Sequence, residues 1–266
     1  MKKQTEDKLA KYAHVKLDIV NEREYEVLPT GIKELDEITG TGGLPFGRIY
    51  EIYGPESVAK TTLTLQIIAQ AQKEGHTCAF VDMEHAFHKE YSADLGVDKN
   101  KLDIYQPDYG EQALQIAQDL IDSGTKIVVV DSVAALSPKA EIEGDVEQRH
   151  VGAMARMMGQ ALRKLVPAVS KNNAILIFTN QLRSSISSMG MGLQEFTPGG
   201  KALKYYASIR LELKKMKSNA GIKNGQIAYS LIRLKATKNK VGLPYREATL
   251  LFTLGKGFIG EKKSGK

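Results

Sequence analysis

The chain carries, at residues 54–62, the stretch Gly54-Pro55-Glu56-Ser57-Val58-Ala59-Lys60-Thr61-Thr62. A short apolar run at 48–53 precedes it, and residues 61–75 follow with apolar side chains at helical spacing. A loop that joins a strand to a helix directs backbone N–H groups and the helix N-terminus at bound phosphate. The stretch therefore predicts a nucleotide-binding loop, in which Lys60 contacts the β- and γ-phosphates and the Thr61 hydroxyl binds Mg²⁺.

This loop departs from the usual pattern G-x-x-x-x-G-K-[ST] at one position. Gly54 supplies the tight turn, but Ala59 stands where the second glycine is expected, and Val58 precedes it. Glycine is usual there because the backbone approaches the phosphates closely and a Cβ takes up space. We therefore expect nucleotide binding to survive better than rapid turnover. The alternative is an ordinary strand-to-helix turn.

Composition bounds the class of protein. With 266 residues and 42% hydrophobic content, the chain can bury one sizeable α/β core and is too short for two large domains. The single cysteine, Cys78, excludes a disulfide framework or a cysteine zinc site and fits a reducing cytoplasm. Neither a signal segment nor an apolar run near the ~20 residues that span a bilayer is present. A formal charge of +6 favours a nucleic-acid partner only weakly.

The order of apolar runs predicts the fold. Strand-like runs at 76–83, 127–131 and 174–179 are separated by helical stretches at 111–123 and 152–169, which is typical of an α/β protein whose mostly parallel central sheet has helices on both faces. The segments that follow are richer in alternating strands and predict an antiparallel extension of the sheet, at 207–213, 226–236 and 249–254. The polar residues at the start of the chain predict an arm outside the core.

Polar residues at the carboxyl ends of these strands are the first candidates for chemistry, because ligands of open parallel sheets gather there. Asp131 can hold the Mg²⁺ shell through water, although it also reads as an ordinary strand-terminal residue. Glu84 can orient the water that attacks the γ-phosphate, or it can simply begin a helix. Gln181 can sense the γ-phosphate and pass its presence to the loop beyond.

A long segment of small residues follows Arg183 and ends at Gly200, with scattered apolar side chains such as Ile186. Loops of this length in a compact domain are usually functional or disordered. This one can close on single-stranded nucleic acid, whose phosphates accept N–H bonds and whose bases accept apolar wedges. A disordered linker is the alternative.

Several motifs appear in an order that resembles the RecA family of homologous-recombination ATPases. The resemblance covers about residues 27 to 260. The motifs are Leu44-Pro45-Phe46-Gly47-Arg48-Ile49, Gly54-Pro55-Glu56-Ser57, Val81-Asp82-Met83-Glu84-His85-Ala86, Asp131-Ser132-Val133-Ala134-Ala135-Leu136, Pro138-Lys139-Ala140-Glu141-Ile142-Glu143-Gly144 and Ala155-Arg156-Met157-Met158.

The resemblance implies a RecA-like P-loop ATPase core with ATP and Mg²⁺ as cofactors. Glu84 matches the catalytic glutamate, Gln181 the nucleotide sensor and Tyr91 the tyrosine that stacks on adenine. Lys238 and Lys240 match lysines that reach across a filament interface to the neighbour's ATP, where their charge acts much as an arginine finger does. The implied nucleotide-binding set is Gly54, Glu56, Ser57, Val58, Ala59, Lys60, Thr61, Thr62, Tyr91 and Asp131, with Thr61 and, through water, Asp131 at the metal.

The resemblance also implies two DNA-binding loops, at 143–152 and at 183–200. Arg156 and Arg163 match residues that line the DNA channel, and a separation of seven residues places them on one side of a helix. From the residues alone they would be a solvated face. The implied DNA-binding set is Val151, Arg156, Gly159, Arg163, Arg183, Ile186, Gly199 and Gly200.

The chain departs from the family's pattern at positions that bear on nucleotide preference and turnover. Besides Ala59, His88 stands where the family usually has an aspartate that hydrogen-bonds adenine. Residues 1–26 form a short arm that is expected to add a strand to a neighbour's sheet, with the core at 27–266. The family's C-terminal duplex-DNA-binding domain is expected to be absent, as in a phage-type or C-terminally short form.

The sequence thus predicts an ATP-dependent DNA recombinase. Its subunits would polymerise on single-stranded DNA in the cytoplasm of a bacterial cell or phage-infected host and pair that strand with a homologous duplex, with single-strand-binding and mediator proteins as further candidate partners and no membrane partner. One alternative is a non-catalytic paralogue that binds ATP and stabilises another recombinase's filament. A second is a hexameric helicase or circadian-type ATPase with the same core.

Overall fold

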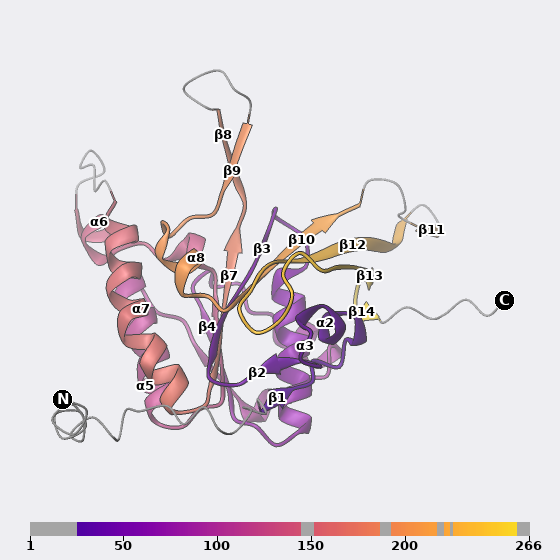
Figure 1. Ribbon diagram of the computed structural model, residues 1–266, viewed down its shortest axis with the longest axis horizontal. Helices are drawn as coiled ribbons and strands as arrows, with labels where there is room; N and C mark the ends of the chain where they lie inside the picture. The colour runs from indigo at the N-terminus through magenta and orange to yellow at the C-terminus, as the bar shows by residue number, and fades with distance from the viewer. Residues whose placement is uncertain (1–25, 145–151, 187–192, 217–220, 224–225, 260–266) are drawn as a thin grey trace, which may run out of the picture.

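The computed structural model describes residues 26–144, 152–186, 193–216, 221–223 and 226–259 (Figure 1). Its centre is a sheet in which the strands follow the order β14-β13-β12-β10-β3-β7-β6-β4-β5, with β11 paired to β12. The parallel part comprises β3 (Arg48–Gly54), β4 (Cys78–Asp82), β5 (Leu102–Tyr105), β6 (Ile127–Asp131), β7 (Ile175–Gln181) and β10 (Ile209–Lys215).

The antiparallel extension lies beyond β10. It comprises β11 (Gly221–Lys223), β12 (Gln226–Asn239), β13 (Glu247–Thr253) and β14 (Gly257–Ile259). A separate pair of short strands, β1 (Val27–Leu28) and β2 (Leu44–Pro45), precedes β3. The prediction of a mostly parallel α/β sheet with an antiparallel extension is therefore confirmed.

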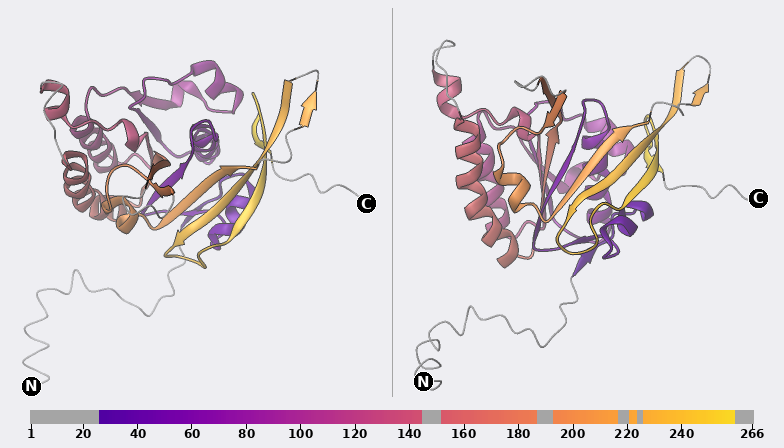
Figure 2. Two further views of the ribbon diagram at one scale, coloured as in Figure 1. Left: turned by 90° about the horizontal axis from the view of Figure 1, so that it is seen from above. Right: turned by 45° about the horizontal axis from the view of Figure 1, so that its top comes forward.

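Helices cover both faces of the parallel strands (Figure 2). One face of these strands packs against α3 (Lys60–Lys73), and the other against α5 (Gly110–Asp122), α7 (Ala153–Lys171) and α8 (Ala202–Tyr206). The short helix α2 (Lys33–Thr39) packs against β12 and β13 of the extension. Along β7, Ile175 and Ile177 belong to the first core and Leu176 and Phe178 to the second. Because both faces are buried, the strands read as continuous apolar runs rather than as alternating ones.

Short elements join these layers. They are α4 (Lys89–Asp94), α6 (Lys139–Glu143), a 3₁₀ turn at Lys99–Lys101 and a second at Val133–Ala135. The segment 183–200, expected to be a loop or a linker, instead contains an antiparallel pair of strands, β8 (Arg183–Ile186) and β9 (Leu193–Phe196). This pair projects beyond the carboxyl end of β7 (Figure 1). These two strands were not predicted from the sequence, because pairing depends on the partner strand, whereas small residues alone carry little strand propensity.

Several predicted features lie outside the described residues, namely the arm up to residue 25, the loop at 145–151 with Val151, and the last residues of the chain. Within the described part of the chain, no helix is long and apolar enough to cross a membrane.

Candidate nucleotide-binding site and DNA-facing surface

The loop between β3 and α3 is shaped by close backbone contacts. A Cβ on Gly54 would lie 2.3 Å from the carbonyl oxygen of Leu213 and 3.0 Å from Cγ1 of Val58, so the position accepts only glycine. The Val58 side chain is itself buried in the core below the loop. Val58 therefore leaves its backbone available to a ligand, while its side chain anchors the loop.

Ala59 adopts a left-handed backbone conformation, with φ 66° and ψ 33°, and Ser57 also has a positive φ of 54°. For an alanine this conformation costs roughly 1–2 kcal/mol, whereas glycine adopts it freely. The glycine of the usual pattern thus has a second physical reason beyond close approach to phosphate. Only the close approach to phosphate is evident from the sequence.

The Lys60 ammonium lies over the loop that precedes it. Its Nζ donates to the carbonyl oxygens of Pro55 at 2.7 Å and Gly54 at 3.2 Å. Burial lowers the pKa of Lys60, while the carboxylates of Asp131 and Glu84 act in the opposite direction. A phosphate placed beside Nζ would favour the charged form further.

Around Lys60 is a cavity of about 470 Å³ in which the ends of separate strands meet. Its lining comes from the loop itself, from the segment after β4, and from the ends of β6 and β7. It comprises Glu56, Ser57, Val58, Ala59, Lys60, Thr61, Glu84, Asp131 and Gln181. Glu84, Asp131 and Gln181 thus lie together at the carboxyl ends of the parallel strands, as predicted from the sequence.

Asp131 is held by hydroxyl donors on both oxygens. Thr61 Oγ1 donates to Oδ2 at 2.5 Å, and Thr179 Oγ1 donates to Oδ1. Burial raises the pKa of Asp131, and the two hydroxyl bonds oppose that rise. A hydroxyl and a carboxylate are hard oxygen ligands of the kind that Mg²⁺ accepts.

Metal-ligating side chains are sparse around this pair, since the described residues contain no group of three or more His, Cys, Asp or Glu residues able to hold a metal ion. Such a site fits Mg²⁺, which retains several waters and binds through one or two protein ligands plus substrate phosphates.

Glu84 lies at the same end of the sheet and is oriented by two neighbours. Ser132 Oγ donates to Glu84 Oε1 at 2.5 Å, and Gln181 Nε2 donates to the same oxygen at 3.3 Å. Glu84 and Gln181, both predicted from the sequence as site residues, are therefore in contact. Ser132 was not among the site residues predicted from the sequence. Its position directly after Asp131 was the available signal, because it places Ser132 at the same strand end.

A second cavity, of about 250 Å³, lies beside the first and is bounded by Tyr91 and His88. The Tyr91 hydroxyl and Thr62 Oγ1 are 2.8 Å apart, and the Tyr91 ring packs partly against the apolar core. His88 caps α4, since its Nδ1 accepts from the backbone N–H of Tyr91 at 3.2 Å. The Tyr91 ring is half-buried, and an aromatic ring beside apolar side chains can support a planar base.

Lys238 and Lys240 lie away from the phosphate loop of their own chain. Lys238 Nζ donates to the carbonyl oxygens of Lys204 and Tyr205, and Lys240 Nζ donates to that of Tyr205. These carbonyls belong to α8, on the sheet face opposite to α3. Burial, with the neighbouring charges of Lys240 and Arg210, lowers the pKa of Lys238 to about 8. In the sheet, β10, β3, β7 and β6 lie between β12, which carries Lys238, and β4, which Glu84 follows closely, so within one chain the two lysines are remote from Glu84.

The residues assigned to DNA lie along α7 and at the base of the 183–200 segment. Arg156 and Arg163 are exposed on one side of α7, with Gly159 between them. Gly199 and Gly200 have positive φ, and a Cβ on either would lie within 2.8 Å of Val133 or Ala155. Arg183 is exposed, while nothing is described of Val151 or of the Ile186 side chain.

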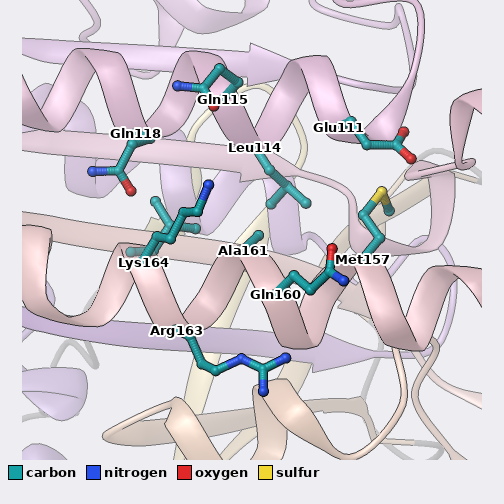
Figure 3. Close-up of a pocket in the computed structure, with 10 residues that line it drawn as sticks. Glu111, Leu114, Gln115, Gln118, Met157, Gln160, Ala161, Arg163 and Lys164 are labelled. Carbon is teal, nitrogen blue, oxygen red and sulfur yellow. The ribbon is translucent and has the colours of Figure 1, made fainter.

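A further hollow of about 410 Å³ lies between α5 and α7 (Figure 3). Arg163 contributes to its rim but points away from α5, whereas Lys164 and Gln118 face the gap between the helices. This hollow is separate from the cavity around Lys60 and shares none of its residues.

Comparison with known proteins identifies the family. The family model described as the RecA N-terminal domain matches residues 1–259. The chain belongs to the RecA family. RecA of Campylobacter lari is 51% identical over 236 residues, which cover 88% of this chain and 68% of that protein. RecA of Symbiobacterium thermophilum is 52% identical over 238 residues, covering 89% and 67%. RecA of Caldanaerobacter subterraneus subsp. tengcongensis is 49% identical over 260 residues, covering 97% and 75%.

Among solved structures, that of the RadB recombinase aligns with a TM-score of 0.67 at 22% identity, covering 88% of this chain and 100% of that one. That likeness supports the fold. Membership of the RecA family at about half identity confirms the expected recombinase function and DNA-dependent ATPase activity.

Proposed function

We propose that this RecA-family protein forms filaments on single-stranded DNA and catalyses homologous pairing and strand exchange, with ATP bound between subunits. The observation that carries the proposal is the convergence of Lys60, Thr61, Asp131, Glu84 and Gln181 on one cavity. Each of these side chains has a defined place in phosphoryl transfer, which depends on positioning and charge rather than on covalent chemistry by the protein.

In this proposal the triphosphate lies on the backbone of residues 54–62, with Lys60 at the β- and γ-phosphates. Thr61 and, through water, Asp131 would hold Mg²⁺, which would neutralise charge on the phosphate oxygens. Glu84 orients the attacking water and accepts its proton. The hydroxyl of Ser132 keeps the Glu84 carboxylate in place.

Gln181 connects ATP hydrolysis to DNA binding in this proposal. Its side chain lies at the Glu84 carboxylate, and the chain continues from it through Leu182 directly into β8. Tyr91 stacks on the adenine base in this proposal. His88 lies beside it where family members usually carry an acidic residue.

The subunit interface is assigned to the face that carries Lys238 and Lys240. Their ammonium groups reach the neighbour's ATP and stabilise charge on its γ-phosphate. Large exposed side chains accompany them on this side of the molecule, namely Tyr205 at the end of α8 and Leu243 and Tyr245 in the turn between β12 and β13. Such a head-to-tail contact repeats along an open filament.

DNA is assigned to Arg156, Gly159 and Arg163 on α7 together with the 183–200 segment. The contacts would be to the phosphate backbone, so base pairing between the strands reads the sequence. The partners proposed are single-stranded DNA, a homologous duplex and further copies of the chain. Single-strand-binding and mediator proteins, and a cytoplasmic location, stay predictions from the sequence.

Strand invasion tests the proposal. The protein is mixed with ATP, Mg²⁺, a labelled single-stranded oligonucleotide and a homologous supercoiled duplex, with a heterologous duplex and a Lys60→Ala variant as controls. Homology-dependent joint molecules that require Lys60 are expected. Their absence, with ATP binding intact, would favour the paralogue that stabilises another recombinase, an alternative to which the left-handed Ala59 lends support. Rings instead of filaments in negative-stain images would favour a hexameric ATPase.

A further inference from the structure

A buried ion pair lies between two strands at the centre of the sheet. Glu51, in β3, has a fully buried side chain, and its Oε2 accepts from Nε of Arg210, in β10, at 2.5 Å. The two residues are direct partners in the parallel register of β3 and β10. Burial of both charges carries a desolvation penalty, so a pair of well-packed apolar residues in such positions often stabilises a fold as much as the ion pair does. Stability alone therefore gives a weak reason for this pair.

Asn180 connects the pair to the base of the 183–200 segment. It is fully buried, and its Nδ2 donates both to Glu51 Oε1 at 2.9 Å and to the carbonyl oxygen of Pro198 at 3.1 Å. Pro198 directly precedes Gly199 and Gly200. The same Asn180 accepts, through Oδ1, from the backbone N–H of Gln181 at 2.9 Å. One side chain thus contacts the strand that presents Gln181, the base of the segment and the buried carboxylate.

Arg210, the other member of the ion pair, is connected to Lys238 through Tyr53 and Thr237. The Arg210 guanidinium lies 4.5 Å from the centre of the Tyr53 ring, and the Tyr53 hydroxyl is 2.9 Å from Oγ1 of Thr237. Thr237 Oγ1 also donates to the carbonyl oxygen of Arg210 at 3.3 Å and directly precedes Lys238. Lys238 is the register partner of Arg210 in the antiparallel pairing of β10 with β12. The contacts from Asn180 to Lys238 are therefore continuous.

We propose that Asn180, Glu51 and Arg210 are positioning residues that couple DNA at the 183–200 segment to ATP hydrolysis, at Gln181 within the subunit and at Lys238 toward its neighbour. The inference rests on the proposed function, because that function assigns DNA and ATP to these places. Displacement of the Pro198 carbonyl removes one of the two acceptors of Asn180 and changes how Asn180 holds Glu51 and Gln181. A coupling of this kind is reciprocal, so ATP tightens DNA binding by the factor by which DNA tightens ATP binding.

The test compares coupling in the wild type, in Asn180→Ser and in Glu51→Gln. Serine is too short to reach both acceptors, and glutamine keeps an acceptor for Asn180 while it removes the charge that holds Arg210. Asn172→Ser is the matched control, because the Asn172 amide also donates to a carboxylate, that of Asp122, and to a backbone carbonyl, that of Ala168, but at the opposite end of the sheet. Thermal unfolding confirms which variants fold.

Two ratios are measured at fixed salt. The first is ATP turnover with and without single-stranded DNA, and the second is affinity for that DNA with and without a non-hydrolysable ATP analogue. Both ratios are expected to fall by roughly 3- to 30-fold in Asn180→Ser and Glu51→Gln, with DNA-independent turnover retained. The Asn172→Ser protein is expected to keep both ratios. If Asn180→Ser does not fold, Glu51→Gln carries the same expectation.

The outcomes separate this inference from the proposed function. A wild type stimulated by DNA, with folded variants stimulated to the same extent, would overturn the coupling role alone. Variants that lose basal and stimulated turnover in proportion would mark a structural role and overturn it as well. A wild type without any DNA stimulation would overturn both the proposed function and the coupling.

Discussion

The hydroxyl of Thr61 donates a 2.5 Å hydrogen bond to Oδ2 of Asp131, which joins the first turn of α3 to the last residue of β6. The contact therefore holds together the two side chains proposed for the Mg²⁺ site, Thr61 and Asp131. The bond lowers the pKa of Asp131, but burial has the larger effect and raises it, so the charged carboxylate is disfavoured in the folded chain.

Asp131→Asn should therefore separate stability from activity. The amide is neutral and of similar shape, so the free energy of unfolding at neutral pH should rise, while ATP hydrolysis should fall by roughly 100-fold or more because the metal loses its carboxylate. Denaturant unfolding and steady-state hydrolysis across a Mg²⁺ titration measure the two effects. Asp122→Asn, at the end of α5, is the control and should leave hydrolysis unchanged. Unchanged Mg²⁺ dependence in Asp131→Asn would remove Asp131 from the metal site.

Glu84→Gln should stop hydrolysis while it spares ATP-dependent DNA binding. Glutamine keeps an acceptor for Ser132 Oγ but has no basicity, so the expected loss of turnover is about 10²- to 10⁴-fold. Turnover and DNA affinity in the presence of ATP are measured on the same preparations, with the exposed Glu90→Gln as control. Equal hydrolysis in Glu84→Gln and the wild type would exclude Glu84 as the general base.

The part of this site that could be predicted from the sequence consists of strand ends. Asp131, Glu84 and Gln181 each follow an apolar run, and parallel strands bring their carboxyl ends to one edge, so their convergence requires no knowledge of side-chain contacts. The bond from Ser132 to Glu84 and the pair of Glu51 with Arg210 could not be predicted this way. They join residues 48 and 159 positions apart, and only strand order and register bring them together.

Ala59→Gly should relieve backbone strain in the phosphate loop. Because Ala59 has a φ of 66°, glycine should raise the free energy of unfolding by about 1 kcal/mol and preserve or increase turnover. Ala161→Gly is the matched control with the opposite sign, since it places glycine inside the α7 helix and should cost about 1 kcal/mol. Denaturant unfolding and steady-state hydrolysis are the measurements. A large loss of turnover in Ala59→Gly would contradict the steric interpretation of this loop.

Mixed filaments should show that Glu84 and Lys238 act from different subunits. Glu84→Gln and Lys238→Ala proteins should each be inactive alone, but a neighbouring pair can combine the intact Glu84 of one with the intact Lys238 of the other. In a random equal mixture about a quarter of the head-to-tail contacts are of this kind, so about a quarter of the wild-type hydrolysis should return. Hydrolysis is measured on single-stranded DNA as a function of mixing ratio. If the mixtures hydrolyse no more ATP than the two variants do separately, Glu84 and Lys238 act in the site of one subunit.

The pKa of Lys238 predicts a pH dependence of stability in the absence of nucleotide and DNA. Lys238 releases its proton near pH 8 in the folded chain, because of burial and of the charges of Lys240 and Arg210, whereas the ordinary value is 10.5. Between these two values the unfolded chain holds more protons, so the contribution of Lys238 to the free energy of unfolding rises with pH. Lys238→Met should flatten that rise. The variant also loses the hydrogen bonds to the α8 carbonyls, which lowers the free energy of unfolding by the same amount at every pH and leaves the slope unaffected. Denaturant unfolding from pH 7 to 10.5 compares the slopes, with Lys73→Met as control, and identical slopes in Lys238→Met and the wild type would contradict the lowered pKa.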